Sequence, residues 1–390
     1  MTLTPPSPHR RLESVDVLRG VVMIIMALDH TRDYLGAAAG DPTNLATTTT
    51  ALFFTRWITH FCAPVFFLLT GTGARLSLQR KGRPGLSRYL LTRGLWMVFL
   101  EPIVVRCLVY QFNFDFHVTL LLILWALGWS MVVLSALIWL PTWAIAAFGL
   151  VMIAGHNALD VIRSGHPLWI ILHGRGIVYS VTDHVVLAIY PLIPWVGVTA
   201  AGFALGAIYA WDRERRRAWL ARAGLVTVAT FLALRGINIY GDPSPWKAQA
   251  SAVFTVLSFI NTTKYPASLL FLMMTLGPAL LFLRAVDGRT PAFLRPALTL
   301  GKVPLFYYLG HFTLIHAIAA VVCLVRYGSM WYTFESPDLA NFPFRAPPGW
   351  GYPVPMVWVW WGFVVLAMYP LCRWFAGVKA RRQDWWLGYL

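Results

Sequence analysis

The chain alternates between long apolar stretches and short basic or polar connections. About 20 apolar residues in a helix cross the roughly 30 Å of bilayer hydrocarbon, and ten stretches reach or approach that length. They lie near residues 15–36, 51–78, 88–110, 118–139, 142–158, 192–211, 218–238, 266–284, 303–325 and 355–376. None alternates with a period of two, so the pattern predicts an all-α, polytopic membrane bundle rather than a β-barrel.

Positive charge alternates between successive connections. Lys and Arg gather at residues 10–11, 75–93, 213–222, 284–302 and 373–382. They are sparse in the intervening connections, 37–50, 111–117, 159–191, 239–265 and 327–354. The positive-inside rule therefore predicts that both termini are cytoplasmic and that the sparse connections lie outside. Residues 168–172 of the third outer connection form an apolar run too short to cross, so a re-entrant or interfacial segment is expected there.

Composition agrees with a membrane bundle. The 390 residues are 58% hydrophobic and 12% charged, and the net charge of +16 comes from basic residues in short loops, which argues against nucleic-acid binding. The four cysteines lie in apolar stretches without metal-like spacing, so neither a disulfide framework nor a metal or haem cofactor is expected. Residues 1–390 are expected to form one unit, with motif-bearing helices at 14–110 and a cytoplasmic tail at 377–390.

The first apolar stretch carries ionisable side chains on one face. The eleven-residue step from Arg19 to His30 is nearly a whole number of turns and covers roughly 16 Å. The stripe on that face consists of Asp16, Arg19, Met23, Met26, His30 and Asp33. A charge at mid-membrane costs at least about 2.5 kcal/mol, so such a residue normally faces the bundle interior. We expect this helix to line a site, and the same charged residues argue against a cleaved signal peptide.

Two histidines are expected at one membrane depth near the outer surface. Arg56 and His60 lie one turn apart on the second stretch, which runs back inward beside His30. The imidazole pKa near 6.5 suits a group that accepts a proton and later returns it. Asp29 or Asp33 could orient the ring, and spacing does not choose between them.

Further polar side chains are expected in the outer half of the bundle. Arg106, Arg235 and Lys264 lie at outer ends of their stretches. His311 and His316 diverge by roughly 140° around a helix, so at most one of them is expected to face the same cavity.

Other interpretations fit the same residues. Arg19 could snorkel to the cytoplasmic surface, and isolated histidines often hold helices together. The charged stripe would also suit a transporter or flippase pathway. His30 and His60 could ligate a haem, which a Soret band in the visible spectrum would reveal.

Several segments resemble one membrane-enzyme family. They are residues 11–20, with the pattern Arg-Leu-x-Ser-x-Asp-x-x-Arg-Gly, and residues 64–67, 263–271, 303–308, 372–375 and 384–387. Together they resemble the bacterial heparan-α-glucosaminide N-acetyltransferase-like proteins of the transmembrane acyltransferase superfamily. The spacing of Arg19 and His30 is also similar to that of membrane acyltransferases that O-acylate surface sugars.

The resemblance implies an acyltransferase. It implies acyl transfer from cytosolic acyl-CoA, such as acetyl-CoA, to a hydroxyl or amine of a glycan or amino sugar at the outer face. It also implies a multi-pass protein among the lipids of a bacterial inner membrane, and it leaves a homodimer open.

On this resemblance, the site residues divide into three groups. Expected catalytic residues are His30, His60 and Asp29; donor-side residues are Arg19, Arg75, Arg80 and Lys81; acceptor-side residues are Asp33, Arg56, Arg106, Arg235 and Lys264. The chain departs from the animal enzyme at one point. There, a proposed active histidine precedes an Asp-x-x-x-Pro-x-Phe motif, whereas here His60 occupies the place of that Asp and residues 47–50 are threonines.

Overall fold

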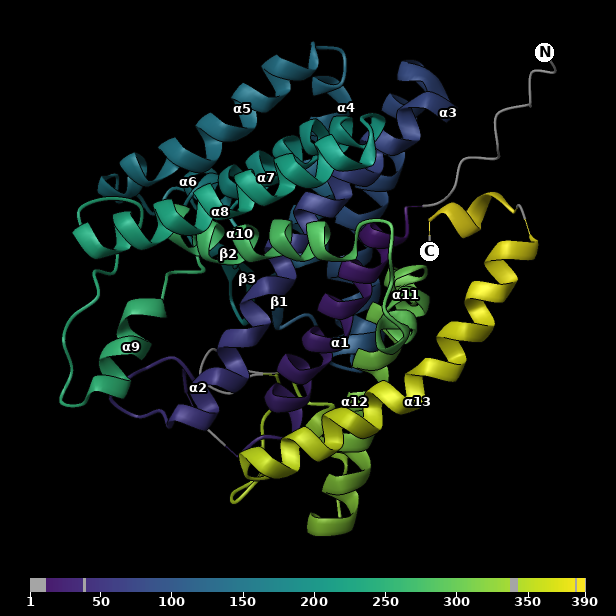
Figure 1. Cartoon of the computed structure of the whole chain (residues 1–390). Coiled ribbons are helices and arrows are strands. Elements are labelled where there is room, and N and C mark those ends of the chain that lie inside the picture. The colour runs from purple at the N-terminus through teal and green to yellow at the C-terminus, as the bar shows by residue number, and fades with distance from the viewer. Residues whose placement is uncertain (1–11, 38–39, 337–342, 383, 390) are drawn as a thin grey trace, which may run out of the picture.

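The structure, a computed structural model, describes residues 12–37, 40–336, 343–382 and 384–389 and consists mostly of helices (Figure 1). The α-helices are α1 (Glu13–Leu35), α2 (Thr50–Trp57), α3 (Cys62–Leu100), α4 (Ile123–Leu137), α5 (Thr142–Gly155), α6 (Pro167–Leu172), α7 (Leu192–Leu205), α8 (Arg213–Ile237), α9 (Ala252–Ile260), α10 (Leu269–Val286), α11 (Arg295–Gly301), α12 (Pro304–Tyr327) and α13 (Val354–Arg381). Short 3₁₀ turns are η1 (Ile58–Phe61), η3 (His156–Val161), η4 (Gly206–Ala210), η5 (Ala292–Leu294), η6 (Trp331–Thr333) and η7 (Trp385–Gly388), and η2 (Glu101–Tyr110) is a π-helix. The strands are β1 (Val118–Leu121), β2 (Gly176–Val181) and β3 (His184–Ala188).

The predicted helical membrane bundle is confirmed. Within the described residues, seven helical stretches are long and apolar enough to cross a membrane. One of them, Thr50–Tyr110, contains two predicted spans in a single run. Gly82, with a φ of 65°, breaks α3 between those two spans, because glycine adopts this left-handed backbone without a Cβ clash. α1 is long enough but carries many charges, and α4 has 15 residues.

A small sheet at the expected outer side was not predicted. β3 pairs in parallel with β1 and antiparallel with β2, so the order is β1-β3-β2. The span expected at 118–139 therefore begins with a strand, and its helix starts only at Ile123. The apolar run at 168–172 lies in the short helix α6. The pairing of residues 118–121 with 184–188 cannot be predicted from the sequence of either segment alone.

α1 lies in the middle of the bundle, with α11 and α12 beside it (Figure 1). The crossing of α1 and α11 depends on two glycines. A Cβ on Gly20 would lie 1.7 Å from the carbonyl oxygen of Ala297, and a Cβ on Gly301 would lie 1.8 Å from that of Asp16. Small residues let helix backbones approach this closely in membranes.

Gly20→Ala is expected to lower the free energy of unfolding by about 1–3 kcal/mol, because the new methyl group forces α11 away from α1. Thermal unfolding of the purified protein in detergent measures the effect. Gly362→Ala on α13 is the matched control, since its Cβ would meet no atom within 4 Å. Equal melting temperatures for the Gly20 variant and wild type would refute the close crossing.

Candidate active site

A cavity of about 990 Å³ lies in the half of the bundle that holds the basic connections. α1 contributes Asp16, Arg19, Met23 and Met26 to its wall. These residues recur at helical spacing, so they share one face of the helix. The predicted stripe of α1 therefore lines a cavity as far as Met26.

The wall of this cavity is strongly basic. Its cationic lining residues are Arg19, Arg75, Arg80, Arg93, Lys302 and Lys379. Among the described lining residues, the one carboxylate is that of Asp16, which accepts a hydrogen bond from Arg19 at 2.8 Å. Arg19 also donates to the Gly301 carbonyl at 3.1 Å, so α1 and α11 together fix its position. A cleft lined by one sign of charge concentrates ligands of the opposite sign.

The C-terminal segment closes part of the cavity wall. Gly82 divides α3 into a first arm before it and a second arm after it. Tyr89 on the second arm donates a hydrogen bond to the Gly388 carbonyl at 3.2 Å, and Thr92 and Tyr389 share one at 2.8 Å. Gly388 itself lines the cavity. Lys81 is not among the described lining residues; its ammonium lies 4.3 Å from the centre of the Tyr89 ring.

The deep end of the cavity lies close to His30. Met26 and Tyr308 line the cavity, and His30 follows Met26 by one helical turn. The His30 and Tyr308 rings meet edge to face with centroids 6.5 Å apart. His30 is half-buried. Among the described residues of α1, Met26 is the last to line the cavity, one turn before His30.

His30 pairs with a histidine from α12. His30 Nδ1 lies 2.7 Å from His311 Nε2, and His311 Nδ1 lies 2.7 Å from the Tyr307 carbonyl oxygen. A carbonyl oxygen can only accept, so His311 Nδ1 carries a proton. In a pair of neutral rings, His311 Nε2 is then the acceptor and His30 Nδ1 the donor. The free lone pair is left on His30 Nε2.

Aromatic rings hold this histidine pair in place. His30 stacks on Phe312 with ring centroids 3.7 Å apart, and His311 stacks on Tyr307 at 5.0 Å. His311 is completely buried. The two imidazoles therefore keep a fixed orientation relative to each other.

The two aspartates expected to orient an imidazole bind arginines instead. Asp29 pairs with Arg56, and with Arg32 at 2.6 Å. Arg32 also pairs with Asp33 at 2.5 Å. The Arg56 contact joins α2 to α1. These ion pairs occupy the carboxylates next to His30, and the ring is held by His311.

His60 lies apart from the histidine pair. Its ring packs edge to face on Phe271 at 5.3 Å, and among the described residues no hydrogen bond or ring contact joins it to His30. Its Nδ1 is buried and has no hydrogen-bond partner among the residues that the structure describes. Lys264 lies within electrostatic range of both His60 and Asp29, with its ammonium 5.1 Å from the Tyr265 ring centre.

Arg106, expected on the acceptor side, holds connecting segments together. It donates to Asp115 at 2.7 Å, to the side chain and carbonyl of Asn113 at 2.9 Å and to Ser336 at 3.2 Å. These contacts join η2 to the connections at 111–117 and 327–354.

Arg235 is buried and binds backbone. It donates to the carbonyls of Phe259, Ser244, Ser258 and Asn261 at 2.8–3.1 Å. Its guanidinium therefore ties α8 to the connection that carries α9.

The pairing of His311 with His30 could not be predicted from the sequence, although the different orientations of His311 and His316 could. The helical divergence of His311 and His316 predicts that at most one faces the cavity side, and His316 instead binds the Thr333 carbonyl at 2.7 Å. Which of the two faces His30 depends on how α12 rotates against α1, and neither helix encodes that alone.

These features define a class of protein: a polytopic helical membrane protein with a basic cavity close to a pair of histidines. Residues 11–241, more than half of the chain, match the family described as heparan-alpha-glucosaminide N-acetyltransferase, catalytic. The chain belongs to this family, as the sequence resemblance predicted. No curated protein matches the chain. The matched residues include His30 and the cavity arginines of α3, whereas His311 lies outside the match.

Proposed function

We propose that this protein, a member of a family of membrane N-acetyltransferases, moves an acetyl or other short acyl group from cytosolic acyl-CoA to a hydroxyl or amine of a sugar at the outer face. One observation carries the proposal: Met26, which lines the basic cavity, lies one helical turn before His30 on α1. The residues that line that cavity come from both ends of the chain, from Leu12 near the start to Gly388 near the end. This supports treating the chain as one functional unit. A bacterial inner membrane with both termini cytoplasmic is part of the proposal.

The cavity suits a nucleotide-bearing donor. Ligand sites typically have volumes of about 300–1,000 Å³, and this cavity has about 990 Å³. Arg75 and Arg80 on the first arm of α3, and Arg93 on the second, would bind the phosphates of CoA. The apolar wall at Met23 and Met26 would hold the pantetheine arm and lead the thioester toward His30.

His30 would act as the general base. Its Nε2 lone pair takes the proton of the sugar hydroxyl or amine while that oxygen or nitrogen attacks the thioester carbonyl. A C–O or C–N bond forms, the C–S bond breaks, and the CoA thiolate finally takes the proton from His30. His311 stabilises the charged ring by accepting the hydrogen bond from His30 Nδ1. Direct transfer in this way needs no acyl-histidine intermediate.

The acceptor would approach from the opposite side. Asp33 keeps 29% of its side-chain surface exposed, and the neighbouring Asp29–Arg56 pair is about 13–14% exposed. These polar groups would bind sugar hydroxyls, with Lys264 beside them. Arg106 and Arg235 have structural roles in this proposal, because their donors are used by the protein itself.

Arg80→Ala is expected to raise the KM for acetyl-CoA about tenfold and to change kcat less, because one charge-assisted phosphate contact contributes about 1.5 kcal/mol or more. Initial rates at varied acetyl-CoA measure it. Arg88→Ala is the matched control, since Arg88 is exposed on the same helix and lies outside the cavity wall. Equal KM shifts in both variants would contradict donor binding in this cavity.

The proposed function is tested by CoA release from purified protein supplied with acetyl-CoA and a panel of amino sugars and oligosaccharides. We expect release that depends on acceptor, with the acetylated sugar identified by mass spectrometry. Sugar flux into liposomes without CoA release would assign the protein to transport instead and overturn the proposal.

A further inference from the structure

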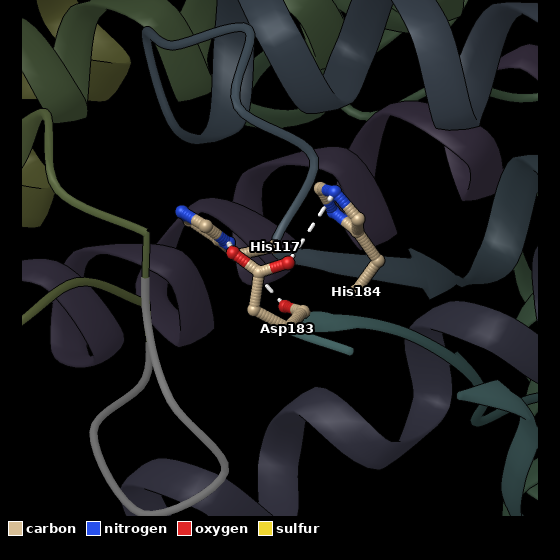
Figure 2. Close-up of side chains that lie close together, drawn as sticks. All are labelled: His117, Asp183 and His184. Carbon is tan, nitrogen blue, oxygen red and sulfur yellow. Dashed lines mark hydrogen bonds and ion pairs between the residues drawn. The ribbon is translucent and has the colours of Figure 1, made fainter. Parts of the chain in front are cut away.

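Three side chains with metal-binding atoms meet on the small sheet, outside the cavity and the histidine pair. His117 immediately precedes β1, while Asp183 and His184 lie where β2 turns into β3. The parallel register pairs Val118 with Val185, so His117 and His184 become neighbours although 66 residues separate His117 from Asp183. Figure 2 shows the Asp183 carboxylate between the two imidazole rings.

We propose that His117, Asp183 and His184 bind one divalent transition-metal ion of the Zn²⁺ class at the outer face of the protein. Two imidazoles and one carboxylate are a usual donor set for such ions. The candidate ligand atoms all lie within 4.8 Å of one another. This inference does not depend on the proposed acyl transfer.

The distances between the ligand atoms agree with one shared ion. Bonds of about 2.0–2.2 Å in a tetrahedral Zn²⁺ site separate neighbouring ligand atoms by roughly 3.3–3.6 Å. His117 Nδ1 lies 3.1 Å from Asp183 Oδ2, and His184 Nε2 lies 3.6 Å from Asp183 Oδ1. His117 Nδ1 also lies 3.3 Å from the Asp183 backbone carbonyl oxygen, so in a neutral ring it carries a proton that it would release on binding the ion. The side chains are 44–59% exposed, so water can complete the coordination shell.

The orientation of His184 leaves a gap suited to a cation. His184 Nδ1 lies 3.2 Å from the Phe116 carbonyl oxygen, which can only accept, so Nδ1 carries the proton in a neutral ring. Nε2 then directs a lone pair toward Asp183 Oδ1, which is also an acceptor. A metal ion between these atoms satisfies both, and the Nδ1 bond to a backbone carbonyl is the outer-shell contact that metal-binding histidines usually make.

The backbone beside the ligands is held in an unusual conformation. Phe116, immediately before His117, has a φ of 58°, and Thr182, immediately before Asp183, has a φ of 53°. Val181 pairs with His184, so Thr182 and Asp183 form a two-residue hairpin turn, where glycine or asparagine is usual at positive φ. Non-glycine residues held at positive φ cluster at binding sites.

A second group with the same residue types is less suitable. His156, Asp160 and His173 also bring their donor atoms within 4.8 Å. There the His173 and Asp160 side chains are only 4% and 21% exposed, so water has little access to complete the coordination shell of an ion. We therefore assign the ion to the group on the sheet.

An ion at this position would connect two outer segments. Asp115, two residues before His117, is bound by Arg106 at 2.7 Å and by Ser336 at 2.5 Å. Coordination would link the β2–β3 turn to this anchored segment, and thereby to the end of η2.

The test is Zn²⁺ titration of the full-length protein, purified in detergent without a histidine tag and stripped with EDTA. We expect one equivalent of Zn²⁺ to bind, and Co²⁺ to give the visible absorption of a tetrahedral site. Asp183→Asn, which keeps the shape of the turn, and His184→Ala should each weaken Zn²⁺ binding by at least about tenfold to a hundredfold. Gel filtration confirms that both variants remain folded.

Two histidine variants serve as controls. His166→Ala removes an exposed histidine of the same outer connection and should leave the titration unchanged. His156→Ala should also leave it unchanged. Zn²⁺ binding that survives in both Asp183→Asn and His184→Ala, binding that is lost in His156→Ala, or no binding to the wild-type protein would each overturn the proposal.

Discussion

His30→Ala is expected to lower kcat for acyl transfer by about 10²–10⁴-fold, the range that a positioned general base contributes. The free lone pair of the histidine pair lies on His30 Nε2, and His30 follows the lining residue Met26 by one turn of α1. Steady-state CoA release by purified protein measures the loss, and membrane insertion and gel filtration should be unchanged.

Two further histidine variants locate the effect. His311→Ala removes the acceptor of the His30 Nδ1 hydrogen bond, so we expect a smaller fall in kcat with little change in the KM for acetyl-CoA. His166→Ala, in an outer connection, should keep wild-type turnover. Full turnover by the His30 variant would end its assignment as the base, and selective loss in His60→Ala would transfer that role to His60.

Arg235→Met is expected to destabilise the protein by about 3–5 kcal/mol, the usual cost of removing one partner from a buried charged network. Arg235 is 1% exposed and donates to four backbone carbonyls, which methionine cannot satisfy. Asp242, 3.9 Å away, would also lose its cation. The measurement is the melting temperature in detergent.

The same variant separates a structural role from a substrate-binding role. Arg222→Met, exposed on the same helix α8, is the control and should melt like wild type. The surviving folded fraction of Arg235→Met should keep a normal KM for the sugar. A raised KM at unchanged stability would restore Arg235 to the acceptor site.

Much of the architecture could be predicted because lipid constrains single helices strongly. Each apolar stretch contains a helix, and the spacing of Asp16, Arg19, Met23 and Met26 indicated which face of α1 lines a cavity. Both inferences use local periodicity, which one segment carries by itself.

Features that depend on two distant segments could not be predicted. The sheet requires residues 118–121 to meet 184–188, and the His30–His311 pair requires a particular rotation of α12 against α1. The partner of Asp29 could not be predicted either. An imidazole and two arginines were candidate partners, and the packing of the helices determines which of them Asp29 contacts. Arg235 was predicted to bind the acceptor. Its four partners are backbone carbonyls, and the pattern of side chains in the sequence does not indicate such contacts.

The end of the cavity at Met26 and Tyr308 has a consequence for traffic across the bilayer. Under the proposed function, the bulky nucleotide never has to leave its own compartment, since only the acyl group passes these side chains. The free CoA left after transfer would leave through the same cavity by which acyl-CoA entered. The cell would thus decorate an external polymer without exporting an energy-rich metabolite, and breaking the thioester would drive the transfer.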